Sequence, residues 1–229
     1  MQENKKIEKV YCVYDGIKPD VALDSRFSKV ESYSTAKRLG PAEARNIGLN
    51  EGFGKGHSDA LLIDCDVKME EENLNQLIKS FSKKPSAIAC PLVRSLGSTW
   101  LDHYHNLSGT LNGRYLKTSN EMNLLFGTTS CMFIPKKIWD NKIMFCPDFS
   151  EAAGEDIDFC LRVIFAGFQI AALNVNVLHW YGYNGNDKHD WTSFLSRFER
   201  YGRGERLLTI KHPYHHFLIG QTIERLNWE

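Results

Sequence analysis

Strand-like and helix-like segments alternate along most of this chain, and this alternation limits the folds that it can adopt. Runs of β-branched, aromatic and other apolar residues predict strands at residues 9–16, 59–64, 87–93, 127–135 and 169–180. Helices are predicted between and beside them, at residues 40–56, 70–81, 136–139 and 154–168. Such alternation is typical of an α/β protein with a doubly wound, mostly parallel (mixed) sheet flanked by helices.

Local signals mark the ends of two of these helices. Pro41 suits the first position of a helix, and the glycines from Gly52 onward end the segment 40–56. Gly167 caps the segment 154–168 in the same way. The stretch 94–122 is polar and rich in Gly, Ser and Asn, so it predicts a long loop region over the functional site.

A chain of 229 residues suits one large α/β domain, alone or with a short appendage. We predict a core domain over residues 1–190 and a helical appendage over residues 191–229. Arginines recur in the appendage at three-residue spacing beside aromatic residues, which is typical of a solvated helix face; binding of a diphosphate or an anionic acceptor is the alternative. As a further alternative, the aromatic residues of this segment are buried against the sheet or against a partner subunit.

Charge and cysteine content exclude some classes of protein. Lys plus Arg equals Asp plus Glu at 28 each, so the chain lacks the basic field with which a nucleic-acid-binding protein attracts its ligand. The six cysteines are scattered without zinc-ligand spacing and predict reduced thiols, mostly buried. The polar start "MQENKKIEKV" and the lack of a membrane-spanning apolar run predict a cytoplasmic protein.

Two carboxylates with one residue between them end the strand "ALLID". Side chains at positions i and i+2 of an extended chain leave on the same side, so Asp64 and Asp66 repel each other unless a cation lies nearby. In open α/β sheets, ligands bind beyond the carboxyl ends of the strands, where this pair stands. Oxygen ligands without thiolates suit Mg²⁺ or Mn²⁺. A solvated pair of aspartates in a turn is the simpler explanation of this motif alone.

Two further segments carry residues of the same chemistry. "GEDID" places Glu155, Asp156 and Asp158 at the start of a predicted helix, where carboxylates also stabilise the helix dipole without any other role. "NVLHW" places His179 at the end of a predicted strand, as a third metal ligand or as an ordinary hydrogen-bonded histidine.

Taken together and in this order, the motifs resemble those of the nucleotide-sugar glycosyltransferases of family 2. The resemblance rests on "GPAEARNIG", "IDCDV", "GTTSCMFI", "AAGEDIDFCLRVIFAGF" and "VLHW", and it covers about residues 9–182. It implies the GT-A fold and a metal-dependent, inverting transfer of a hexose from a nucleotide sugar, here a UDP-sugar, to an acceptor hydroxyl of a glycan or glycoconjugate.

The resemblance also implies a metal site and its ligands. Asp64 matches the acidic residue that approaches the ribose or the metal, and Asp66 matches the ligand of the Mn²⁺ or Mg²⁺ ion that bridges the donor diphosphate. His179 is similar to the additional metal or diphosphate ligand after the last core strand. A bound cation would also remove the repulsion between the two aspartates.

Four other residues take their expected roles from the same resemblance. Asp156 matches the catalytic base, and Glu155 then holds the acceptor or orients the base. Arg45, within "EARN", and Asp15, within "VYDG", resemble nucleotide contacts. Direct displacement at an anomeric carbon needs a group that accepts the proton of the attacking hydroxyl, and a carboxylate such as Asp156 suits that task.

One departure from the family concerns the start of the chain. Family members usually begin with a strand, a helix and a second strand before the Asp-rich nucleotide turn, whereas about eight residues precede "KVYCVYDG" here. We therefore expect either that the first strand–helix unit is missing or that the N-terminal half is shortened. In the family, that first strand helps to hold the nucleotide base.

Two other functions stay open at this point. A sugar nucleotidyltransferase has a similar sheet, but the Gly-rich N-terminal phosphate loop expected there is absent. A non-catalytic module that kept the sheet and lost donor binding is the alternative from another class. The expected partners are a nucleotide-sugar donor and a glycan or glycoconjugate acceptor, with no nucleic acid; association with the membrane surface and with a second copy of the chain also stay open.

Overall fold

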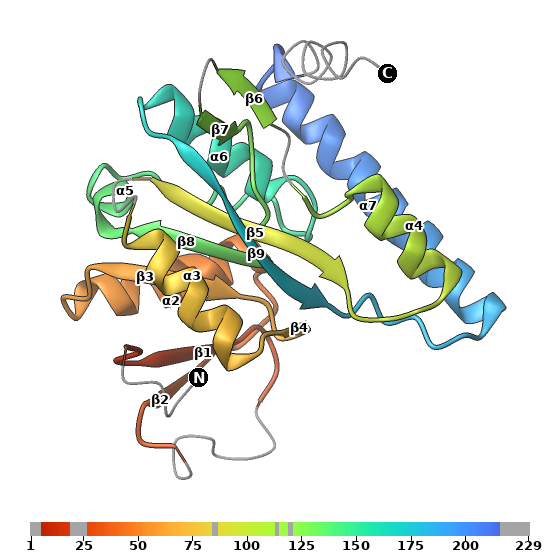
Figure 1. Ribbon diagram of the computed structural model, residues 1–229, viewed down its shortest axis with the longest axis horizontal. Coiled ribbons are helices and arrows are strands. Elements are labelled where there is room, and N and C mark those ends of the chain that lie inside the picture. Colours follow the sequence, from red (N-terminus) through yellow and green to blue (C-terminus); the bar gives the residue numbers. More distant parts are fainter. Residues whose placement is uncertain (1–5, 19–26, 84–86, 113–114, 119–120, 216–229) are drawn as a thin grey trace.

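A mixed β-sheet with helices on both faces forms the centre of the computed structural model (Figure 1), as predicted. The structure describes residues 6–18, 27–83, 87–112, 115–118 and 121–215. Six strands follow the order β3-β8-β5-β9-β7-β6, and β4 pairs with β9 outside this path. The strands of this sheet are β3 (Asp59–Ile63), β4 (Val67–Lys68), β5 (Ile88–Ser95), β6 (Tyr115–Thr118), β7 (Glu121–Leu124), β8 (Cys131–Pro135) and β9 (Ile170–His179).

The large sheet contains more antiparallel pairs than predicted. Within it β5 and β9 pair in parallel, whereas β8 is antiparallel to both β3 and β5, so that β3, β5 and β9 run in one direction. β6 pairs with β7, and β7 pairs with β9, both in antiparallel fashion. β6 and the start of β7 lie in the segment 94–122, which was expected to be a loop, and these strands account for two of the additional antiparallel pairs.

The first two strands form a sheet of their own. β1 (Val10–Tyr14) and β2 (Val30–Ser34) pair in parallel and lie apart from the large sheet (Figure 1). The sequence predicted β1 as a buried strand, but all five of its residues are half-buried. One side of β1 is covered by helix α2 (Pro41–Gly54), because Gly48 and Gly52 of α2 approach the side chains of Val13 and Tyr11.

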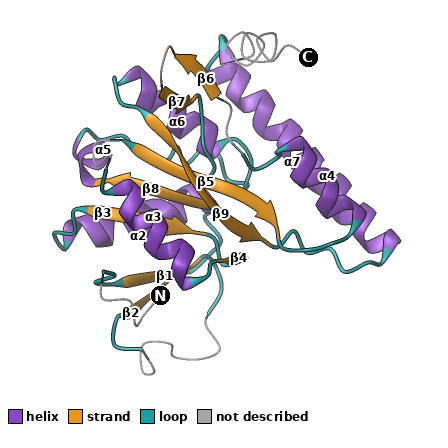
Figure 2. Ribbon diagram, viewed as in Figure 1, coloured by secondary structure: helices purple, strands orange, loops and turns teal. Residues whose placement is uncertain are grey.

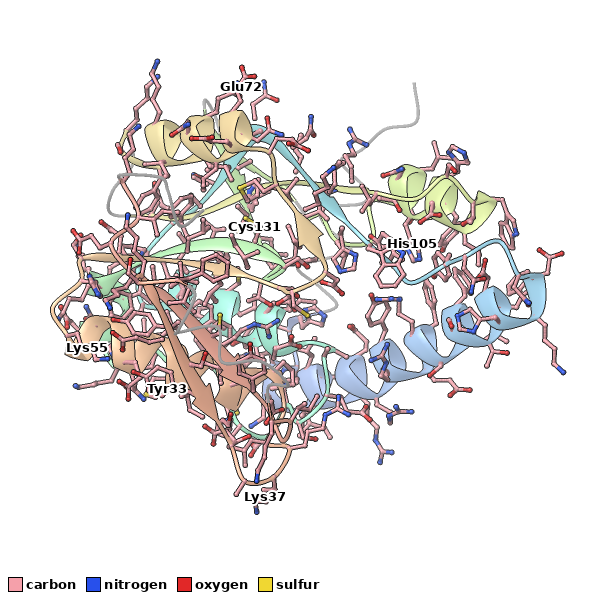
Figure 3. All side chains as sticks on the ribbon, turned by 90° about the horizontal axis from the view of Figure 1, so that it is seen from below. Tyr33, Lys37, Lys55, Glu72, His105 and Cys131 are labelled. Carbon is pink, nitrogen blue, oxygen red and sulfur yellow. The ribbon has the colours of Figure 1, made fainter. Side chains whose placement is uncertain are left out.

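The remaining helices flank the large sheet (Figure 2). They are α3 (Glu71–Phe81), α4 (Trp100–Ser108), α5 (Lys136–Asp140), α6 (Glu155–Phe165) and α7 (Asp187–Lys211). The predicted helix signals are confirmed: α2 begins at Pro41, and α6 ends shortly before Gly167, whose φ of +85° suits a glycine. Figure 3 shows α3 above the sheet and α2 below it.

Side chains of successive strand residues fill two separate cores, one on each face of the sheet. Met132 and Ile134 of β8 pack with α2 and α6, whereas Cys131 and Phe133 pack with α3 on the other face. This alternation follows from the two-residue period of a strand. The same alternation decides on which face of the sheet a polar residue at the end of a strand lies.

The prediction of a loop at 94–122 is wrong. β5 extends to Ser95, and α4 follows after a turn. A capping box starts α4: the Thr99 hydroxyl accepts from the Asp102 backbone N–H, and the Asp102 carboxylate accepts from the Thr99 N–H. Leu101 and His105 are then buried against α7 and the chain after β9, which supplies the packing that a short polar helix needs.

The appendage predicted over residues 191–229 begins within α7, which starts at Asp187 and lies beside α4 (Figure 1). Residues 216–229 of this appendage lie outside the described residues, and the proposed division at residue 190 stays a prediction.

The cysteines are free thiols, as predicted, with Cys90, Cys131 and Cys160 buried and Cys65 exposed. No helix in the described part of the chain has the length and apolar character needed to cross a membrane.

Candidate active site

The short strand β4 brings Asp66 and His179 together. After β3 the chain turns at Asp64, where the Val67 N–H donates to the Asp64 carbonyl oxygen at 3.1 Å. Val67 then pairs with His179, and the Trp180 N–H donates to the Asp66 carbonyl oxygen at 2.9 Å. As a result, Asp66 Oδ1 lies 3.4 Å from His179 Nε2.

The same two side chains have polar atoms without partners. Among the described residues, Asp66 Oδ1 and His179 Nδ1 are buried and accept or donate no hydrogen bond. Burial lowers the pKa of His179, although the charge of Asp66 opposes this shift. A neutral imidazole beside a carboxylate is the protonation state that binds a metal ion.

These residues fit a divalent cation that is held partly by its substrate. Among the described residues, no group of three or more His, Cys, Asp or Glu side chains is arranged to hold a metal ion. A pair of protein ligands is nevertheless sufficient for Mg²⁺, which usually binds through one or two carboxylates together with substrate phosphates and water. The unsatisfied oxygen of Asp66 is the atom that such an ion would satisfy.

Arg45 of α2 connects the two acidic parts of the site. Its Nη2 donates to Asp64 Oδ1 at 3.1 Å, and its Nη1 donates to Glu155 Oε1 at 2.8 Å. The side chain of Arg45 is 12% exposed and that of Glu155 is 5% exposed. Burial lowers the pKa of Arg45, but the charges of Asp64 and Glu155 outweigh this and raise it overall. Arg45 therefore stays charged and joins three elements of the fold.

Glu155 and Asp156 begin helix α6 at the edge of this cluster. Asp156 is half-buried, and its Oδ1 accepts from the Ile157 N–H at 2.8 Å. Burial and the neighbouring charge of Glu155 raise the pKa of Asp156 to about 7, against the opposing charge of Arg45. Glu155 is 4% exposed, and its Oε2 is buried without a partner. A carboxylate that titrates near neutral pH is suited to general base catalysis.

Asp15 lies in a different environment. Its Oδ1 accepts from the Leu39 N–H at 2.6 Å, and its Oδ2 accepts from the Gly40 N–H at 2.8 Å. Asp15 therefore fixes the turn that leads into α2. No contact among the described residues joins it to Asp64, and its expected contact with a nucleotide stays a prediction, as does that of Arg45.

Helix α7 and the chain after β9 also lie beside these residues. For the arginines of α7 the sequence left a contact with an anionic group open, whereas it did not place the chain after β9 at the site. Arg197 Nη2 donates to the Tyr181 carbonyl oxygen at 3.1 Å, and the Nε atoms of Arg197 and Arg200 are buried without a partner among the described residues. One turn further along, Gly204 approaches the Ala153 carbonyl, just before Glu155. The signal in the sequence that could have pointed to this segment is the aromatic motif "YGY", which begins two residues after the candidate ligand His179.

Comparison with known proteins gives a family and a fold. A family model described as "Glycosyl transferase family group 2" matches residues 60–226. No curated protein matches the chain. Similar solved structures include GalNAc-T7 with UDP, GalNAc and Mn²⁺, at 16% identity and a TM-score of 0.61 over 80% of this chain and 40% of that one.

Two further structures are similar in fold. S. aureus TarS 1-349 has 16% identity and a TM-score of 0.57, over 79% of this chain and 53% of that one. Mannosyltransferase PcManGT from Pyrobaculum calidifontis, in complex with GDP-Man and Mn²⁺, has 14% identity and a TM-score of 0.51, over 80% of this chain and 50% of that one. The chain thus spans 40 to 53% of the length of these structures.

Proposed function

The chain belongs to glycosyl transferase family group 2, and from this membership we propose that it transfers a hexose from a UDP-sugar to a hydroxyl group of a glycan or glycoconjugate, with inversion at the anomeric carbon. The GT-A fold of the similar structures agrees with this activity. GalNAc-T7 was solved with UDP and Mn²⁺ and PcManGT with GDP-Man and Mn²⁺, which supports a nucleotide-sugar donor and a divalent ion.

In the proposed site, Asp66 and His179 hold Mn²⁺ or Mg²⁺, and Asp64 accepts a hydrogen bond from the donor ribose or assists at the metal. When bound, the divalent ion stabilises the negative charge that develops on the departing nucleoside diphosphate. Arg197 and Arg200 of α7 carry Nε atoms that are buried without a partner in the described part of the chain, which supports a contact with an anionic group of either substrate.

Asp156 acts as the general base. The acceptor hydroxyl oxygen forms the new bond to the anomeric carbon, its proton passes to the Asp156 carboxylate, and the bond from that carbon to the diphosphate oxygen breaks. Displacement from the opposite side of the sugar inverts the configuration. Glu155 holds the acceptor or keeps Asp156 in place, and its own Oε1 is fixed by a 2.8 Å hydrogen bond from Arg45 Nη1.

One observation carries this proposal above the others. Arg45 spans from Asp64, beside the candidate metal pair, to Glu155, beside the candidate base. Groups suited to stabilising a leaving group and to deprotonating a nucleophile therefore meet at one site, although they come from distant parts of the sequence.

A panel of UDP- and GDP-sugars, tested with Mn²⁺ and Mg²⁺ by thermal shift, would identify the donor, because a ligand of the native state raises its stability by mass action. We expect Asp66→Asn to abolish the metal-dependent shift. Asp156→Asn should keep that shift and lose sugar transfer, measured as release of UDP and formation of the glycosylated acceptor. Undiminished transfer by both variants would refute the site assignment.

A second candidate function is a module of this fold that does not bind a donor. The separate β1–β2 sheet favours it, because in the described part of the chain these two strands do not continue the large sheet that carries the candidate metal pair. Calorimetric titration with UDP and Mn²⁺ separates the two functions, since absence of binding heat would support the module. Three further expectations stay predictions. Cell fractionation would test whether the protein is cytoplasmic or associated with the membrane surface, and light scattering would test whether it binds a second copy of itself.

A further inference from the structure

In the described part of the chain, the imidazole of His179 has no hydrogen bond of the kind that usually orients a histidine ligand. Its Nε2 faces Asp66 at 3.4 Å, whereas its Nδ1 is buried without a hydrogen-bond partner among the described residues. Metal-binding histidines almost always donate their second ring N–H to a carboxylate, a carbonyl or water, and this fixes the ring. Among the described residues, contacts with neighbouring rings are the candidates for holding the ring of His179 in place.

Tyr181 supplies the ring contact, two residues along the chain. The centroids of the His179 and Tyr181 rings are 4.6 Å apart, with an interplanar angle of 58°. Tyr181 is 5% exposed. A buried aromatic ring in van der Waals contact restricts the rotation of its neighbour, provided that the aromatic ring is itself held in place.

Tyr181 is held by residues from two helices. His105 of α4 stacks on it with ring centroids 3.9 Å apart and an angle of 4°. The Arg197 guanidinium of α7 lies 5.1 Å from the Tyr181 ring centroid, and Arg197 Nη2 donates to the Tyr181 carbonyl oxygen at 3.1 Å. The ring and the backbone of Tyr181 are therefore both fixed.

His105 is anchored in turn and stays uncharged. Its Nδ1 lies 3.0 Å from Thr110 Oγ1 and its Nε2 lies 2.8 Å from the Tyr183 hydroxyl, with the residue 2% exposed. Figure 3 shows His105 on the side of α4 that faces α7. Burial, and then the charge of Arg197, lower the pKa of His105 to about 4, so the neutral ring does not repel Arg197 at neutral pH.

We propose that Tyr181, clamped by His105 and Arg197, is a positioning residue that orients His179 for a divalent metal ion. In this proposal, ring packing does the orienting that a hydrogen bond at Nδ1 does for most histidine ligands. This inference rests on the proposed function, because it takes Asp66 and His179 as the metal ligands. It gives α4 and α7 a role in metal binding although neither helix provides a ligand.

Titration of the full chain with Mn²⁺ in the presence of UDP, followed by electron paramagnetic resonance of free Mn²⁺, tests the clamp directly. Loss of an outer contact of a metal ligand typically weakens affinity by 10- to 100-fold, so we expect about a tenfold weaker Mn²⁺ affinity for Tyr181→Leu. Tyr181→Phe keeps the ring and should restore the wild-type affinity. A role in folding alone would change the melting temperature and leave the affinity of the folded protein unchanged.

His179→Ala is the reference variant in the same titration. If it loses Mn²⁺ affinity while Tyr181→Leu and His105→Leu keep it, the clamp is refuted and the metal site stands. If His179→Ala binds Mn²⁺ as the wild type does, the metal assignment itself is wrong, and the clamp with it. Should Tyr181→Leu fail to fold, the Mn²⁺ affinities of His105→Leu and His105→Phe are compared instead. Only Phe keeps a ring stacked on Tyr181, so the proposal expects weaker binding for His105→Leu alone.

Discussion

Asp156 owes its expected reactivity to its surroundings. Burial and the charge of Glu155 raise its pKa to about 7, so the carboxylate gains its charge only as the pH passes through that value. If Asp156 is the base, kcat/KM for sugar transfer should fall below pH 7 and level off above it. Glu155→Gln removes the neighbouring charge and should move this fall to lower pH; a profile that is the same in both proteins would contradict the assignment.

The raised pKa of Asp156 also affects stability. Between the unfolded value near 4 and the folded value of about 7 the native state binds more protons, so stability is lost as the pH rises through this window. Asp156→Asn removes the charge and should stabilise the protein at pH 8 by roughly 1–3 kcal/mol, since one pKa unit corresponds to about 1.4 kcal/mol. Urea unfolding at pH 8 and at pH 4, where the difference should vanish, measures this effect.

Arg45 holds a buried carboxylate in place. Arg45→Met leaves Glu155, 4% exposed, without its cationic partner, and removal of one member of a buried pair typically costs about 3–5 kcal/mol. The double variant Arg45→Met/Glu155→Leu should recover much of this loss, because apolar replacement of both members is often neutral. Urea unfolding of the two variants tests this; equal stability would show that the pair does not couple α2 to α6.

Most elements of the fold could be predicted because their signals are local. Pro41 and Gly167 mark helix ends, and the apolar runs of β3, β5, β8 and β9 stand out within a few residues of sequence. α4 was missed although "STWLD" contains its capping box, because the segment looks polar until Leu101 and His105 are buried by α7. That packing joins residues about 90 positions apart, beyond the reach of a local pattern.

The sequence indicated the candidate polar residues at the ends of strands and helices, but it did not indicate the contacts between them. Asp64, Asp66, Asp156 and His179 stand at strand or helix ends, where sequence patterns are informative. The two-residue strand β4, which pairs Asp66 with His179, is too short to recognise. The bond from Arg45 to Glu155 crosses 110 positions, so only the folded chain reveals it.

The start of α4 gives a test at the scale of one element. Asp102 is 1% exposed and accepts from the Thr99 N–H at 2.9 Å, from the Thr99 hydroxyl at 2.6 Å and from the Ser95 hydroxyl. Asp102→Ala should destabilise the protein by about 1–2 kcal/mol and speed hydrogen exchange in α4. Asp187→Ala, at an exposed position in the first turn of α7, should cost less than about 1 kcal/mol. Equal losses would contradict the capping role of Asp102.

At the scale of the whole molecule, the candidate site lies where several elements meet rather than within one of them. α2 packs against both β1 and β3, and it carries Arg45 between the two acidic groups. α7 packs against the segment before α6 and also reaches the chain after β9. Movement of either helix should therefore disturb the candidate metal pair and the candidate base together.

Two glycines of α7 test this dependence with a matched control. A Cβ added at Gly204 would lie 2.3 Å from the Ala153 carbonyl oxygen, so Gly204→Ala forces α7 away from the start of α6. We expect a loss of about 1–3 kcal/mol and a loss of sugar transfer. A Cβ at Gly202 meets nothing within 4 Å, so Gly202→Ala should stabilise the helix by up to about 1 kcal/mol and preserve transfer.

The two variants should shift thermal unfolding in opposite directions. For a chain of this size, 1 kcal/mol corresponds to about 2–4 °C in Tm, which calorimetry resolves. Both changes add the same methyl group to the same helix, so helix propensity favours each equally and only the contact with Ala153 separates them. If Gly204→Ala is stabilised and active like Gly202→Ala, then α7 does not pack closely on the segment that carries Glu155 and Asp156, and the site does not depend on that helix.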